Sequence, residues 1–359
     1  MATLFIYQEK IHHNIKQIKR LFARHGNVSI YPVVKVFAGD HRIVQWIEES
    51  GLEYIADSRI ENLKKFASSP LKKVHLRLGQ ISEAKKIIQY SDISLQSQLP
   101  TIFELQRQAV LQDKVHSILL MFDVGDLREG IFYQEDFLPL VSSVEALSHI
   151  HLLGIGTNLT CYGGVVPSVF NMNELIKIAN KIEELIKRPL EVISGGNSSI
   201  FPLLEDRLLP RRINNFRVGE AIFFGRETAY GETIPGCEPT TCILEAELIE
   251  CEQKPSMPIG EMTMDSFGST PSIIDKGRMN RGILAIGKQD VNPHYLLPLH
   301  PEVSILGGSS DHLIVDLGES GFVVGDTLRF TLTYPGLLQV CTSPYVKKRF
   351  ISERKRRKP

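Results

Sequence analysis

The sequence predicts an α/β protein, with a (β/α)8 barrel followed by a C-terminal all-β domain. Between about residue 12 and residue 230, eight short apolar runs alternate with amphipathic helix-like segments, which is the length and pattern of a barrel. After about residue 235 the helical periodicity disappears, and short β-rich runs are broken by Gly, Pro, Asn and Asp. A doubly wound open sheet is the alternative for the first region, because counting strands does not exclude it.

The expected strands of the barrel are apolar runs separated by helical segments. These runs are Val28–Lys35, Tyr54–Asp57, Val74–Leu78, Ile93–Leu95, Ile118–Asp123, Leu152–Gly156, Leu190–Ile193 and Phe216–Val218. The clearest helix runs from Asn171 to Lys187, where Asn171 with Glu174 resembles a capping box. Asp40 is expected to cap the helix that follows Lys35.

The all-β domain is predicted from five further runs and one from the N-terminus. The five are Cys242–Ile249, Gly282–Ile286, Glu302–Leu306, His312–Leu317 and Thr327–Leu332. The first run of the chain, Leu4–Tyr7, is poorly placed for a barrel and is expected to pair with this domain. The predicted boundaries are 8–230 for the barrel, 1–7 with 235–350 for the β domain, and 351–359 for a basic tail. The basic residues from Lys347 onward are interpreted as a solvated end.

Composition excludes several classes of function. The 359 residues are 43% hydrophobic and 23% charged, with a net charge of zero, which is typical of a soluble globular protein and argues against nucleic acid or an anionic membrane as the main partner. No apolar stretch approaches the ~20 residues of a membrane helix, and no secretory signal is visible. The five cysteines have no CxxC spacing, so neither a disulfide framework nor a metal site is expected. A cytoplasmic location is the default.

Lys35 is the first candidate for chemistry, because it follows the apolar run Ile30–Val34. A strand buried on both faces has no favourable place for an ammonium group, so a lysine at its carboxyl end is expected to point into a site. Partial desolvation there would lower its pKa toward the range of a nucleophilic amine. Pyridoxal phosphate (PLP) enzymes need such a lysine for their Schiff base. The alternative is a strand-end lysine that reaches solvent.

Two segments look like anion cradles at neighbouring strand ends. Ser194–Ser199 reads Ser-Gly-Gly-Asn-Ser-Ser, and Arg217–Ala221 carries Gly219 with donors around it. Glycines let backbone N–H groups approach an oxyanion, and late barrel loops commonly bind phosphate. For Ser194–Ser199 the alternative is an ordinary strand-to-helix turn.

Taken together, these features resemble the alanine racemase-like group of PLP enzymes, and within it the alanine/ornithine racemase family. The resemblance spans nearly the whole chain in family order, through the segments Val33–Asp40, Ile55–Asn62, Gly125–Gly130, Gly154–Gly164, Ser194–Ser199, Asn214–Glu220, Ile286–Val291 and Ser309–His312. It implies a PLP-binding barrel, a free amino acid as substrate, and a head-to-tail homodimer in which each β domain closes the partner's barrel.

The resemblance also implies a role for each matching residue. Lys35 would form the Schiff base, Arg217 would face the pyridine nitrogen, and Arg128 would lie near the cofactor phenolate and the substrate carboxylate. The phosphate would be held by Asn197, Ser198, the amides of Gly219 and Glu220, and the phenol of Tyr345. Tyr345 as a core aromatic, and Arg128 in a surface ion pair with Asp126 or Glu129, are the alternatives.

Racemisation needs proton transfer on both faces of the Cα carbanion, and Lys35 serves one face. The tyrosine that alanine racemases use on the other face is replaced in the matching segment by Lys288, their histidine by Asn158, and their modified lysine by Met121. The second base is therefore expected to be Asp311 or Lys288 from a partner subunit. His312, Cys161 and Tyr162 are weaker candidates, with His312 more plausible as a core histidine.

The predicted function is a PLP-dependent amino acid racemase acting on ornithine or another basic amino acid. A guanidinium opposite the ring nitrogen keeps its own proton and so weakens the ring as an electron sink, which favours prompt reprotonation at Cα. The alternatives are an alanine, serine or broad-specificity racemase, and a non-catalytic PLP-binding homeostasis protein. Two further alternatives are a PLP enzyme of another reaction class and a phosphate-binding barrel isomerase that does not use PLP.

Overall fold

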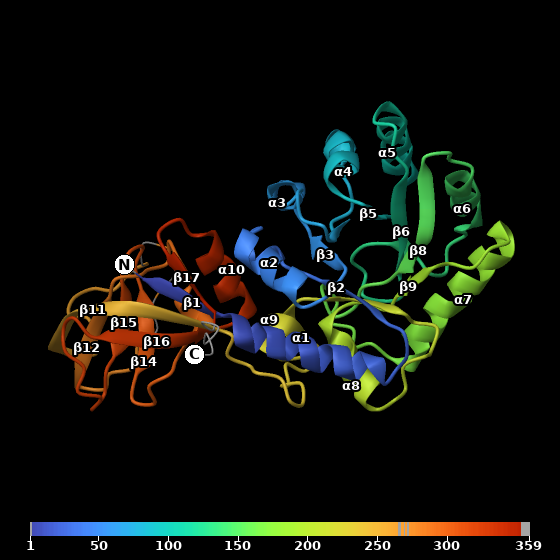
Figure 1. Cartoon of the computed structure of the whole chain (residues 1–359). Coiled ribbons are helices and arrows are strands. Elements are labelled where there is room, and N and C mark those ends of the chain that lie inside the picture. The colour runs from blue at the N-terminus through green and yellow to red at the C-terminus, as the bar shows by residue number, and fades with distance from the viewer. Residues whose placement is uncertain (1, 265–266, 269, 271–272, 353–359) are drawn as a thin grey trace, which may run out of the picture. The chain divides into compact units, whose positions relative to one another are not determined.

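The structure is a computed structural model that describes residues 2–264, 267–268, 270 and 273–352. It divides into two compact units, Glu9–Pro239 and Met1–Gln8 with Thr240–Pro359 (Figure 1). Each unit is described by itself below. Among the described residues, no helix has the length and apolar character that a bilayer span requires.

The larger unit is a parallel (β/α)8 barrel. Its strands are β2 Ser29–Pro32, β3 Tyr54–Asp57, β4 Lys72–His75, β5 Ile93–Gln96, β6 His116–Asp123, β8 Ile150–Gly156, β9 Val192–Ser194 and β10 Asn215–Val218, and the short β7 Ile131–Phe132 pairs with β6. The helices are α1 Gln8–Ala23, α2 His41–Glu49, α3 Ile60–Lys65, α4 Ala84–Tyr90, α5 Leu99–Leu111, α6 Leu138–Glu145, α7 Val169–Ile186, α8 Phe201–Glu205 and α9 Glu220–Phe224. Short 3-10 turns η1 Lys35–Phe37, η2 Ile81–Glu83 and η3 Ser198–Ile200 lie among them.

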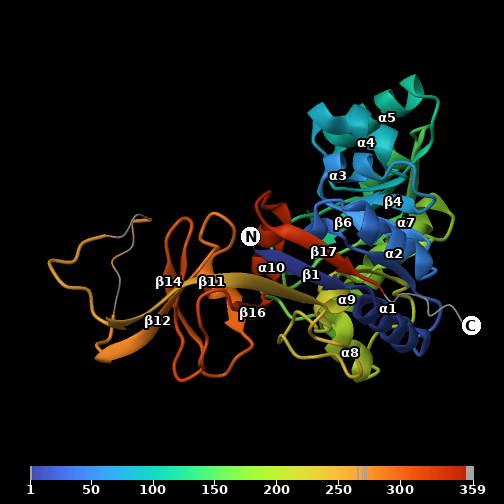
Figure 2. The ribbon, with the colours of Figure 1, turned by 60° about the vertical axis from the view of Figure 1, so that its left-hand side comes forward.

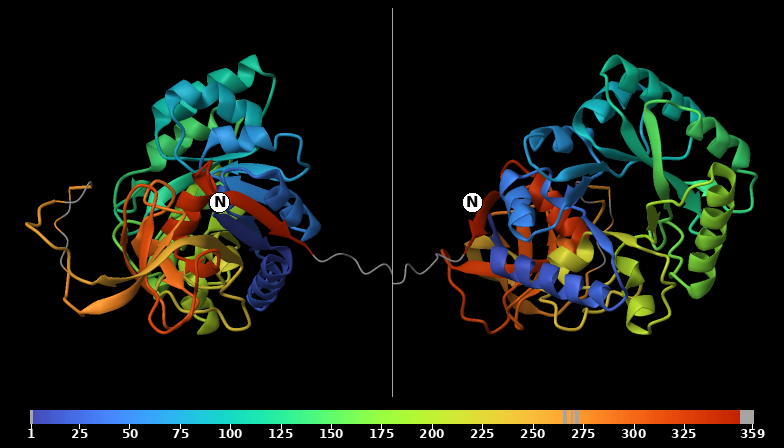
Figure 3. Two further views of the ribbon diagram at one scale, coloured as in Figure 1. Left: turned by 90° about the vertical axis from the view of Figure 1, so that its left-hand side faces the viewer. Right: turned by 45° about the vertical axis from the view of Figure 1, so that its right-hand side comes forward.

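The sheet order is β2-β10-β9-β8-β6-β5-β4-β3, and a single bridge just after β2 joins the first and last members of the ring. Val33 forms a parallel bridge with Ala56, and the Val34 N–H donates to the Ala56 carbonyl at 2.9 Å. This closure excludes the open doubly wound sheet. Figure 3 shows the strands on the inside of this unit and the helices around them. Apolar side chains such as Tyr31, Val74 and Leu119 form the core cluster contributed by the strands.

Two helix starts test the capping predictions. Asp40 accepts from the Arg42 N–H at the start of α2, as predicted. The start of α7 was predicted wrongly: Ser168, three residues before Asn171, is the cap and accepts from the Asn171 N–H. Asn171 is instead buried in the helix, where its side-chain amide donates to the Val124 carbonyl at 2.8 Å.

The strand before Lys35 is shorter than predicted. β2 ends at Pro32, and Lys35 begins the turn η1, which is closed by the Ala38 N–H donating to the Lys35 carbonyl at 3.1 Å. Ala38 then adopts a left-handed φ of 51°, which redirects the chain into α2. Lys35 therefore lies on a turn that follows β2, rather than at the carboxyl end of the strand itself.

The smaller unit is a mostly antiparallel sheet. Its strands are β1 Thr3–Tyr7, β11 Cys242–Pro255, β12 Arg278–Leu284, β13 Leu296–Pro298, β14 Ser304–Gly308, β15 Leu313–Asp316, β16 Thr327–Leu332 and β17 Lys347–Ile351, with the turn η4 Pro293–Tyr295 and the helix α10 Tyr334–Thr342. β1 pairs with β11, which confirms the predicted place of Leu4–Tyr7 (Figure 2).

Two parts of this unit differ from the sequence prediction. α10 is a helix in a domain predicted to be all β; it buries Leu337, Val340 and Cys341. The basic residues from Lys347 do not begin a solvated end: they form β17, which runs parallel to β1 and alternates exposed and half-buried positions. Most of the predicted tail, 353–359, lies outside the described residues.

Candidate active site at the carboxyl end of the barrel

Side chains from several strand ends meet at the carboxyl end of the barrel. The carboxyl ends of parallel strands share one edge, so Lys35 after β2, Asp57 at the end of β3 and Cys161 after β8 are expected near each other. The electrostatics agree with this, because the positive charge of Lys35 is one of the smaller influences that oppose the rise in pKa of both Asp57 and Cys161. In each case burial is the larger influence and raises the pKa, that of Asp57 to about 6.

Lys35 itself is exposed. The desolvation predicted for it is therefore absent from the structure, because the strand ends at Pro32 and the lysine stands on η1. The fold instead fixes the location of the turn that carries Lys35. Phe37, in the same turn, is buried against Phe223 of α9 with ring centroids 4.8 Å apart, which ties the lysine turn to the helix after β10.

Arg217, on β10, is only 4% exposed and is held by two hydrogen bonds. Its Nη1 donates to Ser194 Oγ at 2.5 Å, and its Nη2 donates to the Thr157 carbonyl. Ser194 Oγ in turn donates to Asn215 Oδ1 at 2.5 Å. Burial lowers the pKa of Arg217 to about 10, so the guanidinium remains protonated at neutral pH.

The two predicted anion cradles lie side by side after β9 and β10. Asn197 Oδ1 accepts from the Ser199 N–H at 2.8 Å, and Ser198 Oγ accepts from the Ala221 N–H of α9 at 3.1 Å, so one cradle is bonded to the other. A Cβ on Gly195 would lie 2.5 Å from Ile213 Cγ2, so that position accepts only glycine. Gly219 precedes Glu220, where α9 begins, and the first amides of a helix have no intrahelical acceptor.

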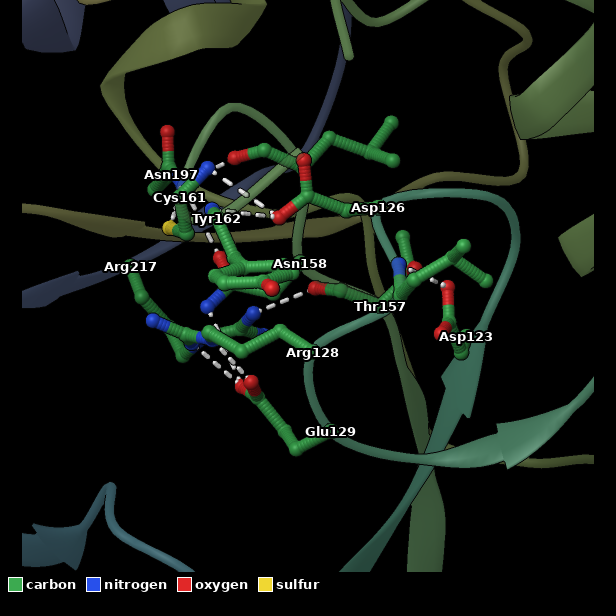
Figure 4. A network of polar contacts seen from close by, with 12 residues as sticks. Asp123, Asp126, Arg128, Glu129, Thr157, Asn158, Cys161, Tyr162, Asn197 and Arg217 are labelled. Carbon is green, nitrogen blue, oxygen red and sulfur yellow. Dashed lines mark hydrogen bonds and ion pairs between the residues drawn. The ribbon is translucent and has the colours of Figure 1, made fainter. Parts of the chain in front are cut away.

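Arg128 belongs to a polar network with Asn158 and Asn197 (Figure 4). Its Nε and Nη2 both donate to the carboxylate of Glu129, so the ion pair that was considered as the alternative for Arg128 is present. Asn158 Nδ2 donates to Glu129 Oε1 at 3.2 Å, and Asn197 Nδ2 donates to Asn158 Oδ1 at 2.9 Å. Asn197 Nδ2 also lies 3.3 Å from the thiol of Cys161.

Asp126 does not pair with Arg128. It is 1% exposed and accepts from the N–H groups of Cys161, Tyr162 and Val165, so it shapes the loop after β8. Asp123 has a similar structural role, because its Oδ1 accepts from the N–H groups of Gly125 and Leu127. Tyr162 is 77% exposed.

The two main candidates for the second base, Lys288 and Asp311, lie in the smaller unit, and the fold of that unit brings their loops together. The Lys288 N–H donates to the Ser309 carbonyl at 2.8 Å, and the Gln289 N–H donates to the Ser310 carbonyl at 3.0 Å, so the loop of Lys288 runs beside Asp311. The Lys288 ammonium lies 4.1 Å from the centroid of the Phe267 ring. Asp311 is exposed and accepts from Ser310 Oγ at 3.0 Å.

Tyr345 and His312 differ from the alternatives considered for them. Tyr345 is 62% exposed, so it is not a core aromatic, and its N–H donates to Ser343 Oγ at 3.1 Å. Ser343 Oγ donates to Asp290 Oδ1 at 2.6 Å, which connects the Tyr345 turn to the loop of Lys288. His312 is exposed rather than a core histidine, because β15 begins one residue later, at Leu313.

The donor set at the barrel end fits PLP. The carboxyl edge presents an amine on Lys35, a buried cationic donor on Arg217, and glycines with hydroxyl and amide donors where a phosphate would bind. Ser199 Oγ and Thr157 Oγ1 are buried without a partner among the described residues, so the site contains polar groups that the protein alone leaves unsatisfied. Met121, at the position of the modified lysine in alanine racemases, is fully buried in the apolar core.

Three residues of the site carry contacts that sequence reasoning did not assign. Glu129 was considered only as a surface partner of Arg128, and Ser194 and Asn215 were not assigned. The available signal was position: Ser194 ends β9, Asn215 begins β10, and the two are register partners. Among the described residues, no group of three or more His, Cys, Asp or Glu side chains could hold a metal ion.

Comparison with known proteins places this site in a family. The model of the alanine racemase N-terminal domain matches residues 6–227. An ornithine racemase from Acetoanaerobium sticklandii is 42% identical over 344 residues, covering 95% of this chain and 97% of the relative. A lysine racemase from Thermotoga maritima is 34% identical over 351 residues, covering 96% and 97%.

Solved alanine racemases share the fold. The enzyme from Bartonella henselae, described with covalently bound pyridoxal phosphate, aligns with a TM-score of 0.73 and 16% identity over 98% of this chain and 99% of that one. The enzyme from Streptomyces coelicolor A3(2) aligns with a TM-score of 0.75 and 16% identity over 98% of each chain. With a family model that matches most of the chain, and relatives similar over nearly its whole length, the chain belongs to the alanine racemase family of PLP-dependent enzymes.

Proposed function

We propose that this chain racemises ornithine, with lysine as the next best substrate, as a cytoplasmic homodimer. The chain is a PLP-dependent amino acid racemase for basic amino acids, as its similarity over nearly its whole length to an ornithine racemase and a lysine racemase indicates. None of the five cysteines forms a disulfide, which is typical of a reducing compartment and supports the location.

The observation that carries the proposal is the buried, protonated Arg217 on β10 at the same end of the barrel as Lys35. PLP, when bound, supplies an electron-withdrawing ring that makes the Cα proton of a bound amino acid acidic. Lys35 would hold the cofactor and then take or give that proton at its Nζ. Asn197, Ser198 and the amides of Gly219 and Glu220 would hold the phosphate.

Arg217 restricts the reaction to proton transfer. Its pKa of about 10 is well above neutral, so it would donate a hydrogen bond to the ring nitrogen of the cofactor without giving up its proton. Ser194 and Thr157 hold two of its N–H groups, which fixes the plane of the guanidinium. A carboxylate there would protonate the ring and favour decarboxylation or transamination, so this arginine supports the racemase over those alternatives. The 95% coverage by a racemase relative also disfavours a barrel-only homeostasis protein.

For the second face, we infer that the partner's copy of the loop pair formed by Lys288 and Asp311 supplies the base. Both residues lie on backbone segments that are hydrogen-bonded to each other, so either side chain could reach the same substrate atom. Asp311 is also the better candidate for recognising a cationic side chain, because Asp290 already accepts from Ser343 Oγ. Tyr345 is proposed to add its phenol to the phosphate site.

A subunit-mixing experiment tests this arrangement. Lys35→Ala subunits and Asp311→Ala/Lys288→Ala subunits should each be inactive, whereas their co-expression should restore about a quarter of the wild-type activity, because random C2 pairing makes half the dimers mixed, each with one intact site. A monomer by analytical ultracentrifugation, or mixed dimers without activity, would contradict the shared site.

A substrate panel tests the main proposal. The purified protein should absorb near about 420 nm when loaded with PLP, and should exchange Cα hydrogen for deuterium in D2O with L-ornithine and L-lysine. Ornithine should exceed alanine in kcat/KM by about tenfold or more, the value of a hydrogen bond to a charged group. Asp311→Asn should reduce this preference, and the control Asp290→Asn should not. Chiral chromatography that finds alanine preferred, or no D-isomer from any substrate, would refute the proposal.

A further inference from the structure

Glu129 connects Arg128 to the predicted phosphate cradle through Asn158 and Asn197, a role that nothing in the family resemblance assigns. Its carboxylate accepts from Nε and Nη2 of Arg128 and from Nδ2 of Asn158. Asn158 Oδ1 accepts from Asn197 Nδ2, and Asn197 Oδ1 accepts from the Ser199 N–H. Figure 4 shows Glu129, Arg128, Asn158 and Asn197 gathered in this network.

Arg128 is the more exposed member of its ion pair with Glu129. Its side chain is 41% exposed, whereas that of Glu129 is 16% exposed, so the carboxylate is the better anchored member of the pair. A bidentate contact to a carboxylate fixes the plane of a guanidinium as well as its location. The other nearby carboxylates, Asp123 and Asp126, accept backbone N–H groups instead.

Glu129 also acts on Arg217. Burial lowers the pKa of Arg217, and the charge of Glu129 is the largest influence that raises it, while the charge of Arg128 lowers it. The negative charge of Glu129 therefore offsets part of the repulsion between Arg128, which it contacts, and Arg217. Its removal would leave two arginines at the barrel end without this compensating charge.

We propose that Glu129 is a positioning residue: it holds Arg128 in the orientation that binds the carboxylate of the substrate. The inference rests on the proposed function, because it takes Arg128 as the carboxylate-binding group. The ordinary alternative is a solvent-exposed ion pair, which contributes little to stability and nothing to binding.

Two halves of the substrate separate these cases. 5-Aminopentanoate is ornithine without the α-amine, and 1,4-diaminobutane is ornithine without the carboxylate. In PLP-loaded Glu129→Gln protein, the dissociation constant of 5-aminopentanoate should rise about tenfold to a hundredfold. The dissociation constant of 1,4-diaminobutane, which has no carboxylate for Arg128 to bind, and that of PLP itself should change by less than about threefold. Visible absorbance and PLP fluorescence report these constants without turnover.

The matched control is Glu104→Gln. Glu104 makes the same bidentate contact to Arg107 on the outer helix α5, with comparable exposure of both side chains. It should change none of the dissociation constants. Glu129→Asp, which keeps the charge, should recover part of the loss.

A double variant tests whether Glu129 acts through Arg128. If it does, Glu129→Gln should add no further loss of 5-aminopentanoate binding in an Arg128→Ala background. Equal weakening of both half-substrates, no weakening of either, or additive losses in the double variant would overturn the inference. A wild type that binds these ligands but racemises no amino acid would instead refute the proposed function, so the two failures are distinguishable.

Discussion

Arg217 on β10 and His75 on β4 are two buried basic side chains in the same barrel. Comparing them shows that burial has different effects on a side chain with hydrogen-bond acceptors and on one without them. Arg217 is 4% exposed and His75 is fully buried. Arg217 has Ser194 and Thr157 as acceptors, whereas neither ring nitrogen of His75 has a partner among the described residues. Burial lowers the pKa of Arg217 to about 10 and that of His75 to about 4.

The consequence is that Arg217 is charged at neutral pH whereas His75 is neutral. Arg217 stays protonated because its pKa, although lowered, starts far above neutrality and Glu129 offsets part of the cost. His75 is neutral, and its neighbour His116 has a pKa lowered by burial to about 3. Burial alone therefore does not mark a functional base in this barrel. The acceptors around the side chain do, because they keep the charged form in place.

The largest effect is expected from removing the amine at the active end. Lys35→Ala should reduce racemisation by about a thousandfold or more, since the variant loses a proton-transfer group and the attachment of the cofactor. The melting temperature of the apoprotein should stay the same, because Lys35 is exposed. Lys177→Ala, which removes an exposed lysine on α7, is the control. Retained activity in Lys35→Ala would show that this end of the barrel has been misassigned.

Arg217→Lys should have the next largest effect. A lysine keeps the charge but cannot donate to Ser194 and Thr157 in the same plane, so we expect kcat to fall about tenfold to a hundredfold. Arg188→Lys, which disturbs the pair with Glu145 away from the site, serves as the control and should keep full activity. If both variants behave alike, the acceptors around Arg217 have no special role.

The smallest effect on activity, and a distinct effect on stability, is expected at His75. The unfolded chain binds a proton near pH 6.5 whereas folded His75 does so only near pH 4, so its contribution to stability is present above pH 6.5 and is lost as the pH falls toward 4. This amounts to about 3 kcal/mol. His75→Leu should therefore flatten the acid side of the stability curve, measured by urea unfolding, and leave kcat unchanged at pH 8.

His41→Gln, at an exposed position at the start of α2, is the control for that experiment. Asp57 contributes with the opposite sign: its pKa is raised to about 6, so its contribution to stability decreases as the pH rises from about 4 to 6. If His75→Leu leaves the acid side of the stability curve unchanged, burial does not lower the pKa of His75 in solution. The contrast with Arg217 would then disappear.

Much of the fold follows from local patterns. The alternation of apolar runs and amphipathic helices predicts the barrel, because each strand carries its own burial pattern in the sequence. The pairing of Leu4–Tyr7 with the β domain was predicted because this first run is poorly placed for a strand of the barrel. The helix α10 and the strand β17 were not, because one depends on apolar contacts made inside the folded unit and the other on the ladder that β1 provides.

For the site, the sequence determined which residue types stand at the strand ends: the amine of Lys35, the arginines 128 and 217, and the glycine-rich turns around Asn197 and Gly219. Only the tertiary structure decided that Glu129 accepts from Arg128 and Asn158, and that Lys35 stands exposed on a turn. Residue type and order are written along the chain, whereas hydrogen-bond partners and burial arise only when distant segments are brought together by packing.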